Sequence, residues 1–570
     1  MLLRYSAPAT LLGEPAPVAA LATTADARAQ ALQQRLLLVL LGLGFFFRLF
    51  HFFNNRSFFI DELFLNVNII KLNFWQLATQ PFDYEQKAPL GYLWASRLSV
   101  LLLGKKEPAL RLFSLLCGLG SLVAFVPVAR HFLRGWSVVL AVGVLALAWP
   151  AVYHSVEAKQ YSCELCATVL ALLLYVKYHH QTTLGARLAW GLGGGLLLWF
   201  SFSAIFVLVG MSIAICLPAL VQRDWKKLAG YLVPCGLWLL SFALVYVLFV
   251  SKYHKSEWLT FFFKVRYDAY LPLGGAGAAL RWLAARAYDL VDLPLGLRLD
   301  VDLVEYAPLT KFVLKLGWVA LPLLGLGAYR LGRQRGQWLL LFLLPVALAL
   351  AASAVQQYPF YERFTLFLAP LLTLVLAYGV QQLGRWPRVG GWLQPLVVVV
   401  LLTVSLANVM QPLLGAKRFY NQSYYREIML YLDSHVQPGD GVYVYWNMRP
   451  AYEYYHEAYQ LKFTAVEGSY VKNKSVSQTD YLRNLQPDFT SLRGKNRLWY
   501  VYDANMLDGI ADMVGQPTWY FSPRQKPGWL LNTYLGTLGQ RVEHYHRSTS
   551  TLQATLYELP QAPPAGTPPR

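Results

Sequence analysis

Charged residues are scarce in this 570-residue chain. Asp, Glu, Lys and Arg make up 14% of it, against 56% hydrophobic residues, whereas ordinary soluble domains carry about 25% charged residues. Apolar runs of about 20 residues, long enough to cross a bilayer, recur along the chain. Together these features exclude a soluble enzyme and predict an α-helical polytopic membrane protein.

Cysteine is also rare. All five cysteines (Cys117, Cys163, Cys166, Cys216 and Cys235) fall inside apolar runs, and none lies in the polar C-terminal part. This distribution excludes a disulfide framework, and Cys163-Glu-Leu-Cys166 lacks the second ligand pair that a zinc site needs. We interpret these cysteines as packing residues within helices.

Acidic residues are outnumbered, because 31 Asp and Glu stand against 50 Lys and Arg, a net charge of +19. Such a balance is also found in nucleic-acid-binding proteins, but here the cations lie in short clusters between the apolar runs. Clusters placed this way fix the orientation of a membrane protein. We therefore predict no nucleic acid partner.

Hydropathy predicts about eleven transmembrane helices in residues 34–414. Their approximate ranges are 34–53, from 108, from 135, 161–178, 187–201, 203–221, 228–250, 310–330, 337–355, 360–382 and 391–412. A further apolar segment, 88–104, is long enough either to span the membrane or to lie flat on it.

The charge of the loops decides between these two alternatives. With residues 88–104 at the interface, five basic loops fall on one side: those with Arg130 and Arg134, Lys177 and Arg187, Arg223, Lys226 and Lys227, Arg330, Arg333 and Arg335, and Arg385 and Arg388. Lys and Arg accumulate on the cytoplasmic side of membrane proteins. We therefore expect an interfacial helix at 88–104, a cytoplasmic N-terminus and an extracytoplasmic C-terminus.

The regions outside the spans differ in composition. Residues 1–33, rich in Ala, Pro and Thr, predict a disordered cytoplasmic tail before an uncleaved signal anchor. Residues 415–560 are the one sizeable polar part. A helix at 424–435 and strands at 441–445, 497–502 and 551–559 predict a small extracytoplasmic α/β domain there, followed by a Pro-rich tail at 561–570.

Four tyrosines follow the first predicted strand of this domain: Tyr452, Tyr454, Tyr455 and Tyr459. Their rings are suited to stacking on sugars, but aromatic side chains more often fill a core. We expect the core role.

Two adjacent carboxylates, Asp61 and Glu62, lie just after the first predicted span, within Phe58 to Asn66. The ordinary explanation is that Asp61 caps a short interfacial helix and Glu62 faces solvent. The alternative is that one carboxylate is a general base at the mouth of a cavity between the helices, since charges near lipid are costly without a function. These residues alone leave both open.

Four other segments on the predicted outer face carry polar or cationic residues at membrane depth. They provide Lys87, then His154, Glu157 and Lys159, then Lys264 and Arg266, and finally Arg363. A single such cation has an ordinary explanation, snorkelling to lipid phosphate. Several cations on the face that also holds two carboxylates instead suit the displacement of a phosphate from a substrate carried in the membrane.

The order of these motifs resembles that of the GT-C membrane glycosyltransferases, and more narrowly glycosyltransferase family 39, which includes protein O-mannosyltransferases and the bacterial lipid A aminoarabinose transferase. The resemblance covers about residues 34–415. It rests on the Asp61-Glu62 pair, Gln86 to Leu90, Leu110-Arg111, and the segment from Tyr153 to Tyr161. Two departures are Lys87-Ala88-Pro89, where the family often has Lys-Pro-Pro, and Lys159, where it often has Arg, so that bidentate phosphate geometry is lost.

The resemblance implies an inverting transfer of a hexose or pentose, such as mannose, from a polyprenyl-phosphate donor to an acceptor lipid, glycan or protein at the outer face of a bacterial inner (plasma) membrane. Asp61 is then the base, and Glu62 orients the loop or the sugar, because helix neighbours point about 100° apart. The predicted donor-phosphate ligands are Lys87, Lys159 and Arg363. The predicted substrate contacts are Tyr84, His154, Glu157, Tyr161 and Tyr358. We expect no metal and no other cofactor.

Two other functions fit a membrane cavity that holds charges. A transporter or lipid-linked sugar flippase predicts inverted repeats and helices broken at Gly or Pro in matching halves, and the sequence has no counterpart of the Gly191 to Gly195 cluster in its second half. A non-catalytic scaffold for surface assembly would not need cations gathered on the carboxylate face.

Overall fold

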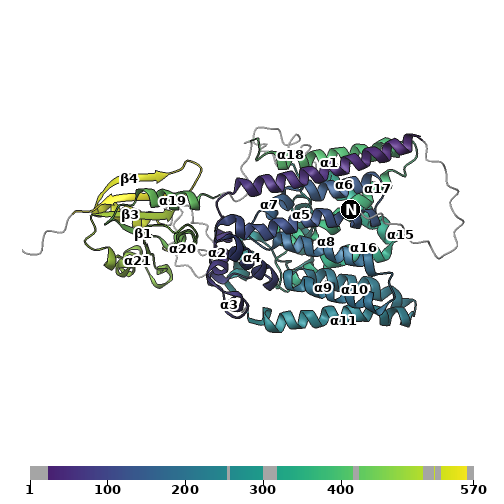
Figure 1. Cartoon of the computed structure of the whole chain (residues 1–570), viewed down its shortest axis with the longest axis horizontal. Helices are drawn as coiled ribbons and strands as arrows, with labels where there is room; N and C mark the ends of the chain where they lie inside the picture. Colours follow the sequence, from purple (N-terminus) through teal and green to yellow (C-terminus); the bar gives the residue numbers. More distant parts are fainter. Residues whose placement is uncertain are drawn as a thin grey trace, which may run out of the picture.

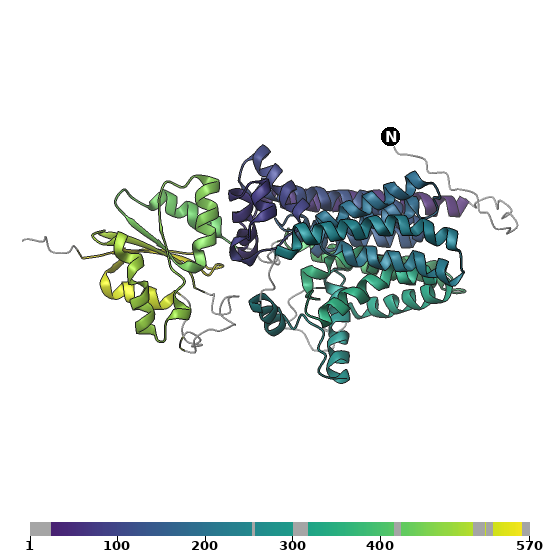
Figure 2. The ribbon, with the colours of Figure 1, turned by 90° about the horizontal axis from the view of Figure 1, so that it is seen from below.

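The chain folds into a helical bundle with a small sheet-containing domain at one end (Figure 1). The computed structural model describes residues 24–252, 257–299, 317–414, 423–504, 519 and 528–560. The predictions for residues 1–23 and 561–570 therefore lie outside the described residues. Figure 2 shows that the short helices α2 (Ile60–Lys71), α3 (Phe74–Thr79) and α4 (Leu90–Leu103) lie between the bundle and the domain.

Among the described residues, eight helices are long and apolar enough to cross a membrane, and nine if a bent pair counts as one span. They are α1 (Thr24–Asn54), α5 (Glu107–Phe132), α8 (Tyr161–Tyr178), α10 (Ala204–Val221), α11 (Trp225–Leu248), α16 (Gly336–Ala354), η3 with α17 (Glu362–Leu383) and α18 (Gly390–Met410), with α6 (Trp136–Leu147) and α7 (Trp149–Ser155) as the bent pair. All of them overlap predicted spans. The predicted fold class, a polytopic helical membrane protein with a small C-terminal α/β domain, is confirmed.

The difference from the predicted eleven lies in two helices. α9 (Leu184–Phe200) has 17 residues and packs on α11, and α15 (Gly317–Gln334) ends in a basic stretch and packs on α17. α4 has 14 residues. At 1.5 Å per residue it is about 21 Å long, shorter than a hydrocarbon core of about 30 Å, and so suits the interfacial position expected for residues 88–104.

The bend between α6 and α7 exposes backbone carbonyl groups inside the bundle. The two helices meet at 46°, with Pro150 in the first turn of α7. Arg48 of α1, which is 1% exposed, donates from its guanidinium to the carbonyl oxygens of Leu145 and Ala146 at 3.1 and 2.8 Å. Leaving such buried carbonyl groups without a hydrogen-bond partner costs about 1 to 3 kcal/mol, so Arg48 stabilises the break.

α15 and α17 pack closely because each has a glycine at the contact. A Cβ atom on Gly327 would lie 2.0 Å from the carbonyl oxygen of Val375, and one on Gly379 would lie 2.0 Å from that of Leu323. Small residues allow this approach of helix backbones in membranes.

The basic loops gather at the end of the bundle away from the sheet domain. The rings of His131 and His179 lie 5.6 Å apart, and His131 lies 6.2 Å from Trp338. The amide of Arg134 donates to the side chain of Gln381 at 2.8 Å. Loops predicted to share one side of the membrane therefore share one end of the molecule.

The C-terminal domain contains a five-stranded mixed sheet in the order β2-β1-β3-β5-β4. β1 (Gly441–Val444) runs parallel to β2 (Val466–Glu467) and to β3 (Arg497–Asp503). β5 (Leu552–Glu558) is antiparallel to β3 and to β4 (Gln540–His546). The helices α19 (Tyr425–His435), α20 (Arg449–Tyr459), α21 (Gln478–Leu485) and α22 (Trp529–Leu538) complete it.

Buried polar contacts join this domain to the bundle. Glu107, fully buried in the first turn of α5, accepts a hydrogen bond from the Tyr459 hydroxyl at 2.7 Å and pairs with Arg426 at 3.2 Å. The Tyr455 hydroxyl lies 3.2 Å from the Ser57 hydroxyl. Tyr452, Tyr454 and Tyr455 are buried, as expected from core packing, although Tyr455 and Tyr459 also serve the contact between the two parts.

Candidate active site

A cavity of about 1000 Å³ lies where the bundle meets the C-terminal domain. Its lining comes from α2, the segments 84–87, 159–164 and 356–364, the ends of α11 and α12 (Glu257–Tyr267), and the C-terminal domain. These segments are far apart in sequence. Asp61, Lys87, Lys159 and Arg363, predicted to share a site, all line this one cavity.

Asp61 and Arg363 form an ion pair in the lining. Asp61 lies in the first turn of α2, and Arg363 in the 3-10 helix η3 (Glu362–Leu368). Arg363 Nη2 is 2.6 Å from Asp61 Oδ2, and both side chains are largely buried. The guanidinium also lies over the ring of Tyr161, 5.6 Å from its centre. The pair places a carboxylate and a cation side by side at the same wall.

Two lysines add to the positive charge of the cavity. Lys159, in the turn between α7 and α8, is 6% exposed, and its Nζ donates to the side-chain oxygen of Gln86 at 2.7 Å. Burial lowers the pKa of Lys159 to about 8. Lys87 is half-buried, and desolvation lowers its pKa as well. Removing an ammonium from water disfavours its charged form, and an anion bound beside these lysines would raise their pKa values again.

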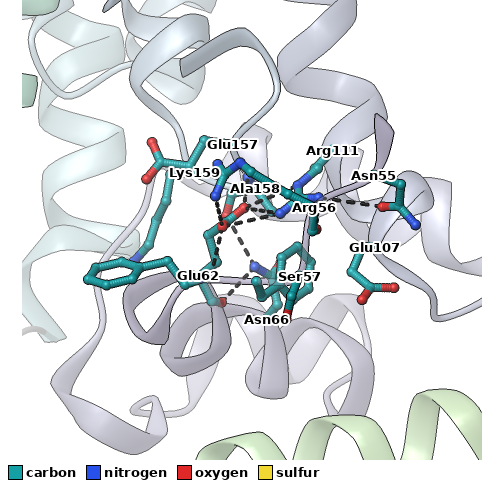
Figure 3. Close-up of polar contacts among 12 residues, drawn as sticks. Asn55, Arg56, Ser57, Glu62, Asn66, Glu107, Arg111, Glu157, Ala158 and Lys159 are labelled. Carbon is teal, nitrogen blue, oxygen red and sulfur yellow. Dashed lines mark hydrogen bonds and ion pairs between the residues drawn. The ribbon is translucent and has the colours of Figure 1, made fainter. Parts of the chain in front are cut away.

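Glu62 lies in a cluster of ion pairs with Arg56 and Arg111 (Figure 3). It is 0% exposed, and it pairs with Arg56 at 3.2 Å and with Arg111 at 3.0 Å. Glu62 is not among the lining residues. Asp61 and Glu62 thus face different surroundings, as expected for neighbouring helix residues, whose side chains point about 100° apart.

Glu62 also ties together the segments that carry the site. It accepts hydrogen bonds from the backbone N–H of Ala158 at 2.9 Å and of Phe59 at 3.0 Å. Asn66 donates to the Ala158 carbonyl oxygen at 3.1 Å. Because Lys159 follows Ala158, this network fixes the position of Lys159 relative to Asp61. Of the two roles expected for Glu62, orientation of the loop is the one that this placement favours.

Three of the five predicted substrate contacts line the cavity: Tyr84, Tyr161 and Tyr358. The Tyr84 hydroxyl donates to Glu453 of the C-terminal domain at 3.0 Å, and that of Tyr358 donates to the Phe364 carbonyl oxygen at 2.8 Å.

The other two, His154 and Glu157, are buried outside the lining and pair with each other at 2.5 Å, from Nδ1 to Oε2. Lys264 and Arg266, expected to join the site, are exposed on α12 and do not line it. The prediction placed these two cations wrongly because residues in one loop can point to different sides.

Sequence reasoning missed several lining residues. Glu164, 4% exposed on α8, accepts a hydrogen bond from the Ser203 hydroxyl at 3.2 Å. A carboxyl inside an apolar run was the available signal for it. Trp446, Arg449 and Tyr470 of the C-terminal domain also line the cavity. Nothing in the sequence indicates that these residues meet the bundle.

One part of the lining is apolar. It comprises Phe202, Phe242, Tyr246, Val250, Leu259, Phe262 and Phe263. These residues lie on or near α10, α11 and α12. Across the part of the chain that the structure describes, no group of three or more His, Cys, Asp or Glu side chains is arranged to hold a metal ion.

Fold and site together define a polytopic helical membrane protein with a charged cavity beneath a C-terminal α/β domain. No protein-family model and no curated protein matches the chain. Among solved structures, it is similar to ArnT from Cupriavidus metallidurans bound to undecaprenyl phosphate, with 13% identity and a TM-score of 0.47 over 94% of this chain and 98% of that one.

A second similar structure is the oligosaccharyltransferase AglB from Archaeoglobus fulgidus in complex with an inhibitory peptide and a dolichol-phosphate. It is 12% identical, with a TM-score of 0.48 over 92% of this chain and 74% of that one. Similarities at this level leave the chemistry of the present chain to be inferred from its own cavity.

Proposed function

We propose that this chain is a GT-C type glycosyltransferase that moves a sugar from a polyprenyl-phosphate donor to an acceptor hydroxyl. The observation that carries the proposal is the meeting of Asp61 with Lys87, Lys159 and Arg363 in one cavity. Glycosyl transfer from a lipid phosphate requires a base near the acceptor and cations near the leaving group. A surface scaffold has no need of this combination.

The proposed reaction is a single inverting displacement. The acceptor oxygen forms a bond to the anomeric carbon while the bond from that carbon to the phosphate oxygen breaks, and the bonding pair leaves on the phosphate. Asp61 accepts the proton of the acceptor hydroxyl. A base positioned in this way typically contributes a factor of about 10² to 10⁴ to the rate.

Lys87, Lys159 and Arg363 then stabilise the departing phosphate. Each preorganised donor of this kind is worth about 2.7 to 4 kcal/mol in a water-excluded site. Arg363 is paired with Asp61 at 2.6 Å. Since a phosphate competes for the same guanidinium, donor binding would loosen the pair and free the carboxylate to act as a base.

The apolar lining contributed by α11 and α12 suits the isoprenoid chain of such a donor. Because it adjoins the charged residues in the same cavity, one lipid is able to place its phosphate among the cations while its chain contacts aromatic side chains. This pairing of surfaces favours a lipid-linked donor over a water-soluble nucleotide sugar.

We propose that the cavity opens on the extracytoplasmic side, in a bacterial inner membrane. The basic loops lie at the opposite end of the bundle, because α5 and α8 begin on the side of the cavity and the C-terminal domain and end at these loops, and Lys and Arg accumulate on the cytoplasmic side. A tag in the C-terminal domain should be accessible to protease from outside intact spheroplasts, and protection of that tag would reverse the orientation.

Replacing the proposed base tests the reaction. The experiment uses the full chain in vesicles with the lipid-linked sugar that copurifies with it, identified by mass spectrometry. Asp61→Asn should lower the turnover of the donor about 10² to 10⁴-fold, whereas Asp83→Asn, on an exposed residue of the same outer segment, should leave it unchanged. Wild-type turnover in Asp61→Asn would exclude Asp61 as the base.

The competing function is transport of a lipid-linked sugar. The bend between α6 and α7 is the feature that favours it, since transporters use broken helices near their sites. Here, however, Arg48 occupies the carbonyls next to the break. Movement of the lipid across vesicles without release of its sugar would support transport, and consumption of the lipid-linked sugar supports transfer.

A further inference from the structure

The C-terminal domain contributes an aromatic wall to the cavity. Trp446, in the 3-10 helix η4 (Trp446–Met448) directly after β1, and Tyr470, after β2, both belong to the lining. Their rings meet at 90° with centres 4.9 Å apart. Tyr470 is 41% exposed, so much of its ring is available to a ligand.

A buried lysine holds both rings in place. Lys472 is 0% exposed, and its Nζ lies 4.6 Å from the centre of the Trp446 ring and 5.0 Å from that of Tyr470. Lys472 does not line the cavity, so its amino group contacts the rings from within the domain, where burial lowers its pKa to about 7. Because one buried amino group contacts both rings, it fixes their orientation relative to each other.

Polar groups stand beside the two rings. Asn473, which is exposed, lines the cavity next to them. Arg449 lines it as well, with its guanidinium held by Glu453 at 2.7 Å and by Glu467 at 2.6 Å. Gly468 also lines the cavity, and a Cβ there would lie 2.7 Å from the Tyr443 hydroxyl and 3.1 Å from the backbone nitrogen of Trp446, so a larger residue would displace the wall.

We propose that this wall, formed by Trp446, Tyr470 and Asn473, binds the acceptor and that the acceptor is a saccharide. Aromatic faces take the C–H faces of sugar rings, and an amide at their edge hydrogen-bonds to hydroxyl groups. The lipid chain has a separate apolar lining on α11 and α12. This inference rests on the proposed function, since it supplies the substrate that Asp61 would deprotonate.

Free sugars test the wall without requiring catalysis. The purified full chain in detergent is titrated with glucose, galactose, mannose, N-acetylglucosamine and their β-linked disaccharides, and binding is read by saturation-transfer NMR. Trp446→Ala and Tyr470→Ala should each weaken the strongest interaction about ten-fold, the cost of one aromatic contact. Tyr470→Phe, which keeps the ring, should bind like the wild type.

Trp529→Ala is the matched control. Trp529 is 52% exposed on α22 and lies outside the cavity lining, so its loss should not change sugar binding. Failure of every sugar in the panel to bind, or equal binding by the wild type and both alanine variants, would overturn the proposal. Circular dichroism identifies a variant that fails to fold, in which case the exposed Tyr470 provides the decisive pair of variants.

Kinetics separate the acceptor from the donor sugar. In the transfer assay, Tyr470→Ala should raise the KM for the acceptor about ten-fold and leave the KM for the lipid donor unchanged. A rise confined to the donor KM would assign the wall to the donor sugar and overturn this inference.

The two proposals fail in distinguishable ways. Sugar binding that depends on Trp446 and Tyr470, in a chain that transfers nothing, would refute the glycosyltransferase function and leave the saccharide site standing. Asp61→Asn, in contrast, should lose transfer and keep sugar binding.

Discussion

The adjacent carboxylates Asp61 and Glu62 have different surroundings and therefore different roles. Asp61 lines the cavity beside Arg363, whereas Glu62 is enclosed by Arg56 and Arg111. The motif therefore joins a group that faces the cavity to a group that anchors its loop. The prediction that both line one chamber holds for Asp61 alone.

Glu62→Gln should destabilise the protein without changing any residue that lines the cavity. Removing the charge leaves two buried guanidinium groups short of a partner, and breaking a buried ion pair in this way costs about 3 to 5 kcal/mol. Unfolding in mixed micelles, followed by tryptophan fluorescence, measures the loss. Glu85→Gln, on an exposed residue, serves as the control, and equal stability of the two variants would contradict a structural role for Glu62.

Donor binding should weaken at alkaline pH. Burial places the pKa of Lys159 at about 8, below the ordinary 10.5, so the ammonium loses its proton as the pH rises through 8. If that charge holds the donor phosphate, the Kd for the donor rises above this pH. The free energy of unfolding should instead increase with pH between about 8 and 10.5. In this range the folded chain has released the Lys159 proton that the unfolded chain still binds, so the cost of burying a charged amine disappears.

Lys159→Arg should abolish this pH dependence, because a guanidinium stays charged throughout the range. Equilibrium binding of the lipid donor between pH 6 and 10 measures the effect. Lys264→Arg, at an exposed position outside the lining, should leave the wild-type profile intact. An alkaline loss that persists in Lys159→Arg would assign it to another group.

At the scale of the elements, hydropathy alone predicted most of the bundle. Spans expected at 161–178, 203–221 and 391–412 correspond to α8, α10 and α18, because long apolar runs leave little choice in a bilayer. The strands around Gly441 and Arg497 were also found. β2 was missed because it has two residues, and the bend after Leu147 was missed because a distant arginine makes it possible.

Arg48→Met should therefore destabilise the bundle at the break. The thioether fills space but donates no hydrogen bond, which leaves the carbonyls of Leu145 and Ala146 unpaired at a cost of about 1 to 3 kcal/mol. Hydrogen exchange should rise in α6 and α7 and remain unchanged in α11. Arg35→Met, in the same helix at an exposed position, is the matched control. Unaltered exchange in Arg48→Met would show that the break is satisfied by other groups.

At the scale of the whole molecule, the cavity depends on how the C-terminal domain docks. Glu107→Gln should weaken docking, because Arg426 and Tyr459 lose a fully buried carboxylate. We expect faster hydrogen exchange in α19 and α20 than in the wild type, and no change in α22. Glu457→Gln breaks an ion pair with Lys105 at the same interface, but both partners are exposed. Exposed pairs contribute about 0 to 1 kcal/mol, so this variant should dock normally.

The contact between the helical bundle and the C-terminal domain was the feature that could be predicted least from the sequence. Asp61, Lys87 and Lys159 were found because they stand near membrane spans where charge is unusual. Trp446 and Tyr470 were not, because a polar domain contains many aromatic residues and no local pattern reveals which of them face the bundle.

The cavity is lined by segments that are far apart in the order of synthesis: α2 is made early, and residues 446–473 are made close to the end. When synthesis has reached the end of α18, all the described bundle helices have been made, but the lining residues Trp446, Arg449 and Tyr470 have not. Activity should thus appear abruptly, once the final portion has folded against α2 and α5, and premature termination after residue 414 should yield an inserted but inert product.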